Sequence, residues 1–87
     1  MRLSNNYVYH MSHGEAALIP TGDTEFSGLV RGNKTLGVIL ELLQSDTTEE
    51  EMIRKLTERF NVTEETASRD VKRVLSELRK IGAIDEQ

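Results

Sequence analysis

The sequence predicts an α+β fold in which a three-stranded antiparallel β-meander is followed by three α-helices. Up to Arg31, short runs of β-branched and aromatic residues are separated by turn residues, which is typical of strands. After Asn33, apolar residues recur at helical spacing. The last two predicted helices are joined by a short turn, as in a helix-turn-helix unit. The architecture is therefore winged-helix-like, with the sheet preceding the helices. A chain of 87 residues has room for one core, so residues 1–87 should form one domain.

The predicted strands cover residues 7–11, 16–20 and 25–31. The first reads "YVYHM", and "SHGE" then supplies a turn in which Gly14 is free to adopt positive φ. Pro20 closes the second strand, and "TGDT" forms the next turn. In the third strand, "EFSGLVR", Gly28 indicates a bulge or a close backbone approach.

The predicted helices cover residues 34–44, 49–60 and 64–81. Asn33 is a favourable N-cap for the first helix. Thr48 and Glu51 have the spacing of a capping box at the start of the second. Thr63 is the predicted N-cap of the third helix, and Gly82 occupies the usual position after its last turn. The two residues that follow, "AI", are expected to fold back over the core.

Composition excludes several classes of function. The chain carries 11 basic and 15 acidic residues and no cysteine, so it has neither a disulfide framework nor a thiolate zinc site. The longest apolar run, "VILELL", is too short to span a bilayer, and the first residues lack the apolar segment of a secretion signal. These features favour the cytoplasm. His10 and His13 have no acidic residue at metal-ligand spacing, and no phosphate loop or nucleophile motif is present. We therefore predict no enzyme activity, catalytic residue, metal or cofactor.

The third predicted helix has a basic outer face. Between Thr66 and Lys80 it carries five basic and two acidic side chains. Such a face is often only a solvated surface, but it also suits a DNA recognition helix, so a winged-helix transcriptional regulator is an alternative function. Glutamates at residues 49–51 and 64–65 oppose this interpretation, because they crowd the helix N-termini that would approach the phosphate backbone. Nucleic acid is therefore the second choice of partner.

A peptide partner fits the sequence better. The third strand of a meander leaves one edge unpaired, and an extended peptide can add to it. A neighbouring helix would supply cations and an apolar floor to the groove. The predicted peptide contacts are Glu25, Phe26, Ser27, Gly28, Leu29, Val30, Lys72, Arg73, Leu75 and Arg79. A third alternative is that the same edge pairs with another copy to give a homodimer.

Two segments, "GNKTLGVILELL" and "TTEEEMIRKLTERFNVTEETASRDVKRVLSELRKIGAI", closely resemble the PqqD-like family, also called the RiPP recognition element. The residues that match the family pattern are Asn33, Ile39, Leu40, Glu41–Leu43, Thr48, Glu51, Glu64, Glu65, Asp70, Leu78–Gly82 and Ile84. The resemblance implies a non-catalytic adaptor. Such a domain binds the leader of a ribosomally made precursor peptide as an added strand beside the third helix, then presents it to a modifying enzyme, often a radical SAM protein. It does not assign the chain to pyrroloquinoline quinone synthesis itself.

Overall fold

The strands and helices follow one another in the order that the sequence predicts, with one short strand added near each end. The computed structural model describes residues 1–12, 15–21, 30–32 and 34–86. The elements are β1 (Arg2–Leu3), β2 (Tyr7–Ser12), β3 (Glu15–Pro20), β4 (Val30–Gly32), α1 (Lys34–Leu42), α2 (Glu49–Arg59), α3 (Glu64–Lys80) and β5 (Ile84–Asp85). Strands β2, β3 and β4 form an antiparallel sheet in that order, and β1 pairs separately with β5. The predicted α+β class is confirmed.

The three helices begin at the predicted residues and end one or two residues earlier than predicted. Of the third predicted strand, the structure describes the part in β4, whereas Glu25–Leu29 lie outside the described residues. The pairing of β1 with β5 is a correction to the predicted three strands. Each of these strands has two residues, which is too short to produce a readable hydrophobic period.

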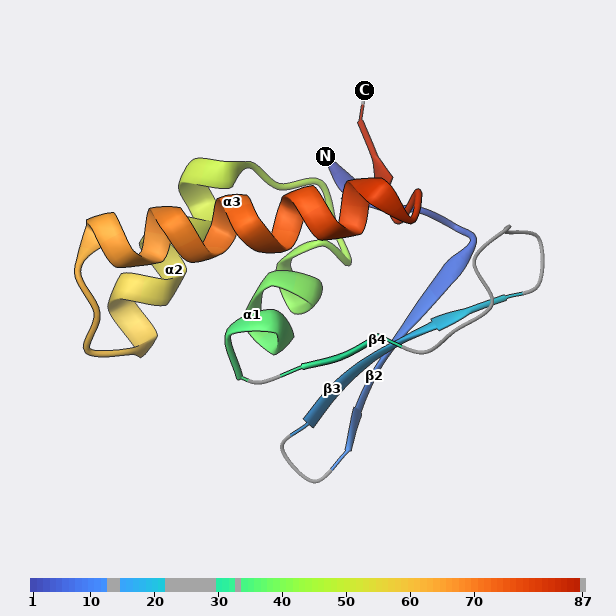
Figure 1. Ribbon diagram of the computed structural model, residues 1–87, viewed down its shortest axis with the longest axis horizontal. Helices are drawn as coiled ribbons and strands as arrows, with labels where there is room; N and C mark the ends of the chain where they lie inside the picture. Colours follow the sequence, from blue (N-terminus) through green and yellow to red (C-terminus); the bar gives the residue numbers. More distant parts are fainter. Residues whose placement is uncertain (13–14, 22–29, 33, 87) are drawn as a thin grey trace.

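Helix α1 is the central element of the fold. It packs against the sheet on one side and against α2 and α3 on the other, as Figure 1 shows. A helix covered on two sides must be apolar around most of its circumference. Accordingly, five consecutive residues of α1, Leu36–Leu40, are buried.

The described ends of α2 and α3 follow the predicted capping chemistry, with one exception, whereas Asn33, the predicted N-cap of α1, lies outside the described residues. The Thr48 hydroxyl accepts a hydrogen bond from the Glu51 amide at 3.2 Å, and the Thr63 hydroxyl caps α3 in the same way. Gly82 has φ of 71°, the left-handed conformation expected after a helix. The exception is the reciprocal half of the capping box, because the Glu51 carboxylate pairs with Arg54 instead. The side-chain cap at the start of α2 is therefore the Thr48 hydroxyl without the Glu51 carboxylate.

The two ends of the described chain are held side by side (Figure 1). The Ser4 amide donates to the Ala83 carbonyl at 2.8 Å, and Ala83 is fully buried, as predicted for the fold-back after α3. The Met1 ammonium group donates to Asp46 Oδ1 at 2.8 Å, and this hydrogen bond lowers the pKa of Asp46. The Tyr7 hydroxyl donates to the Ile81 carbonyl at 2.6 Å. This last bond connects β2 of the sheet to the end of α3.

Gly37 faces β2 and β3 of the sheet from α1, and replacing it with alanine should be neutral or stabilising. A Cβ atom at this position would lie 2.8 Å from Met11 Cε and 3.5 Å from Ala16 Cβ. The methionine methyl is the end of a flexible, half-exposed side chain and can move away. Alanine also restores about 0.5–1 kcal/mol of helix propensity. Urea unfolding should show a midpoint that is equal or higher.

The matched control for this substitution is Gly37→Leu, whose extra carbon atoms would meet Ala16 and its neighbours on the buried face of the sheet. Overpacking of this kind should destabilise the fold by about 1–3 kcal/mol. A lower midpoint for Gly37→Ala than for the unchanged chain would show that Met11 is held in place.

Candidate functional site

The direction of each backbone group in the sheet follows from one hydrogen bond. The Thr21 amide donates to the Asn6 carbonyl at 2.9 Å, and this pair continues the β2–β3 register. Alternate pairs of an antiparallel ladder exchange hydrogen bonds, so the amides and carbonyls of Tyr9 and Met11 point away from β3. Pro20 fits this alternation. It lies opposite Tyr7 in a pair that exchanges no hydrogen bonds, so the sheet loses no β2–β3 bond through the missing proline amide. Two outward peptide groups therefore line the β2 edge.

The same alternation fixes the other edge, which β4 forms. The β3 residues that do not hydrogen-bond to β2 direct their backbone groups toward β4. One of them, Ala16, pairs with Gly32. Leu18 pairs with Val30 in the same way. Arg31 lies between these two pairs, so its amide and carbonyl point away from the sheet. Among the described residues no strand covers this side of β4. Within the described part of the chain, Arg31 thus presents an unpaired backbone donor and acceptor to any chain that adds to this edge.

The predicted cations of α3 are exposed but differ in their pairing. Arg73 has its guanidinium 3.9 Å from Asp70, which is a loose contact. Lys72 is exposed and forms no ion pair with another described residue. Arg79 donates from Nε to Glu86 Oε1 at 2.7 Å, so part of its charge is already neutralised at the C-terminal end. Lys72 and Arg73 are therefore the predicted cations of α3 that are most available to a ligand.

Leu75 is placed differently from the prediction, which made it a peptide contact on the apolar floor of a groove. Its side chain is fully buried in the hydrophobic core. It widens the buried stripe of α3, which otherwise consists of Ala67, Val71, Val74 and Leu78. The physical reason is the central position of α1, which gives α3 neighbours on more than one side. Leu75 belongs to the core.

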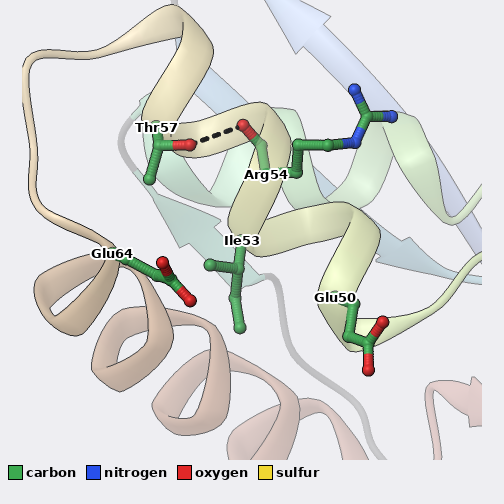
Figure 2. Close-up of a pocket in the computed structure, with 5 residues that line it drawn as sticks. All are labelled: Glu50, Ile53, Arg54, Thr57 and Glu64. Atoms are coloured by element: carbon green, nitrogen blue, oxygen red, sulfur yellow. Dashed lines mark hydrogen bonds between the residues drawn. The ribbon is translucent and has the colours of Figure 1, made fainter.

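A pocket of about 480 Å³ lies between α2 and the start of α3, and none of the predicted peptide contacts lines it. Figure 2 shows Ile53 and the Glu64 carboxylate facing the space between the two helices, whereas the Arg54 guanidinium points away. Arg54 is held there by Glu58 at 2.8 Å and by Glu51. Glu50 and Glu64, which are both exposed, make this end of the helix pair acidic. A nucleic acid backbone would be repelled from it.

The described ranges hold no group of three or more His, Cys, Asp or Glu side chains arranged to bind a metal. None of the helices in the same ranges is long and apolar enough to cross a membrane.

A sequence model of the family described as coenzyme PQQ synthesis protein D matches residues 20–84. The chain belongs to the PqqD family. This confirms the resemblance seen in the sequence, and the match includes β4 and all three helices. Comparison with curated proteins gave no match.

Two solved structures share the fold of this PqqD-family chain. A structure of TbiB1 in complex with the TbiA(beta) leader peptide has a TM-score of 0.77 and 20% identity, and the alignment covers 98% of this chain and 100% of that one. A structure of lasso peptide synthetase B1 with its leader peptide has a TM-score of 0.76 and 18% identity, covering 94% and 93%. At this level of identity the likeness shows the fold.

One candidate site residue, Arg31, was not predicted. The prediction placed the site on the third strand but ended the contacts at Val30. Pro20 was only a partial signal in the sequence, because its missing amide cannot hydrogen-bond to a neighbouring strand. Counting alternately across the sheet from Pro20 then leads to Arg31, provided that the register is known. The register comes from the structure.

Proposed function

We propose that this PqqD-family chain is a non-catalytic adaptor that binds the leader of a ribosomally made precursor peptide. The leader adds as a strand to the free edge of β4, and the adaptor presents the precursor to a modifying enzyme in the cytoplasm. The observation that carries the proposal is the outward amide and carbonyl of Arg31 on β4, whose outer side no other strand of the described residues covers. Those two groups can hydrogen-bond to a guest backbone of any sequence.

The similar structures support this proposal, because both are complexes with a leader peptide. A modifying enzyme, such as a radical SAM protein, is the partner that the family implies. The residues before β4, Glu25–Leu29, stay predicted contacts for the peptide backbone together with Val30.

Selectivity for the leader is expected to come from side chains beside the added strand. Lys72 and Arg73 are exposed cations in a chain of net charge −4, so they would attract acidic side chains of the leader. Arg79 should contribute less because it already pairs with Glu86. The acidic N-termini of α2 and α3 disfavour the alternative of a DNA recognition helix.

The test of this arrangement is the double variant Lys72→Glu with Arg73→Glu. Both side chains are exposed, so the fold should survive. Loss of two favourable charge contacts and the gain of two repulsive ones should weaken leader binding about tenfold at low salt, and less at high salt. Fluorescence anisotropy with labelled peptides, made from the short reading frames beside the gene, measures this change.

The matched control is Arg69→Glu with Lys80→Glu, which changes the net charge equally on the same helix. Arg69 and Lys80 are also exposed and were not predicted as contacts. Equal weakening by both double variants would show only a general effect of net charge. Full affinity in the Lys72 and Arg73 double variant would remove both residues from the site.

A further inference from the structure

The second free edge of the sheet, formed by β2, suits a different occupant. We propose that β2 pairs antiparallel with β2 of a second copy of the chain, giving a two-fold symmetric dimer with a continuous sheet. The β4 edges stay at the outer ends of this sheet. Self-association through β2 is therefore independent of the peptide site proposed above.

The first support is the state of the β2 backbone. The amides and carbonyls of Tyr9 and Met11 point outward, and no other described residue forms a hydrogen bond with them. The outward amide of Tyr7 is already used, because it donates to the Ser4 carbonyl at 3.2 Å. Tyr9 and Met11 are thus two successive outward positions of β2 that no described residue occupies.

The second support is that β2 lacks the features that usually prevent edge pairing. Protected edge strands carry lysine, proline or other charged residues, or are very short. β2 has six residues, "YVYHMS", and none of them is proline, lysine, arginine or an acid. Two of its apolar side chains are exposed, Val8 at 51% and Met11 at 45%. A chain of net charge −4 can therefore approach another copy here without direct repulsion between the strands.

The third support is that the open positions complement each other about a two-fold axis. If the axis passes at His10, Tyr9 of one copy lies opposite Met11 of the other, and both outward pairs exchange hydrogen bonds. That register forms four backbone hydrogen bonds. It also places the exposed Met11 thioether against the Tyr9 ring of the partner, a favourable contact. His10 then lies directly opposite the same residue of the second copy.

The geometry at His10 provides the test. In wild-type protein, the mass measured by sedimentation velocity should rise from 9.9 kDa toward twice that value between about 10 μM and 1 mM. His10→Lys places two like charges opposite each other across the axis, so the dimer should dissociate at least tenfold more readily. His10 is exposed in the single chain, so this variant should keep its circular dichroism spectrum and thermal midpoint.

The control is His10→Thr, which keeps a neutral side chain that favours strands, and it should dimerise like wild type. Met11→Pro should also prevent association, because it removes an outward amide without removing a bond to β3. A wild-type chain that stays at 9.9 kDa at 1 mM would overturn the proposal. Equal dimerisation of His10→Lys and His10→Thr would overturn it as well. A variant altered only at Arg31 should still dimerise, which separates this proposal from peptide binding.

Discussion

Replacing Arg31 with proline is expected to abolish peptide binding while the domain stays folded. The Arg31 amide points away from β3, so proline at this position removes no hydrogen bond within the sheet. The proline ring fills the space in front of the edge and eliminates the donor that a guest strand would use. A lost hydrogen bond together with steric exclusion should lower the affinity at least a hundredfold. Anisotropy titration with the labelled leader peptides measures this loss.

Two variants control for other effects of this substitution. Arg31→Ala retains the amide and should bind the peptide within a few-fold of wild type, which separates the backbone donor from the side chain. Val30→Pro removes an amide that faces Leu18 inside the sheet, so it should destabilise the fold. Normal binding by a folded Arg31→Pro variant would show that the peptide does not pair with β4.

The parts of the fold that the sequence predicted best depend on contacts between residues close in the chain. Thr63 caps α3 and Gly82 ends it because both effects act within one helical turn. The Glu51 carboxylate shows where this reasoning fails. This carboxylate had two partners within reach, the Thr48 amide and the Arg54 guanidinium. It forms an ion pair with Arg54. A capping motif does not reveal such competition.

The parts that could not be predicted depend on contacts between residues far apart in the chain. Periodicity placed Leu75 on a flank of α3 together with Lys72 and Arg79, outside the core stripe. Its full burial results from the packing of other elements around that helix, and no local pattern specifies this packing. The β1–β5 pair is a similar case, since it joins residues 2–3 to residues 84–85. The sequence predicted that a meander leaves a free edge. It did not predict that Arg31 presents the backbone donor at that edge, because this depends on the register of β3 and β4.

Leu75→Ala is expected to destabilise the domain more than any substitution of an exposed α3 residue. Leu75 is fully buried, and removing a core leucine side chain costs about 2–5 kcal/mol through lost burial and the cavity left behind. A domain of this size has a stability near the lower end of about 5–15 kcal/mol. The thermal midpoint should therefore fall by about 10–25 °C. Leu75→Met nearly conserves the volume and should cost less than about 1.5 kcal/mol.

Peptide affinity then distinguishes a core residue from the floor of a groove. At a temperature where Leu75→Ala is still folded, a core role leaves the dissociation constant of the folded fraction close to that of wild type. A groove floor would give the opposite pattern, with a modest loss of stability and a large loss of affinity. Leu75 is fully buried, whereas Lys72 and Arg79 on the same helix are exposed, so we expect Leu75→Ala to lower stability without removing a peptide contact. Stability and affinity should therefore respond to different residues of the same helix.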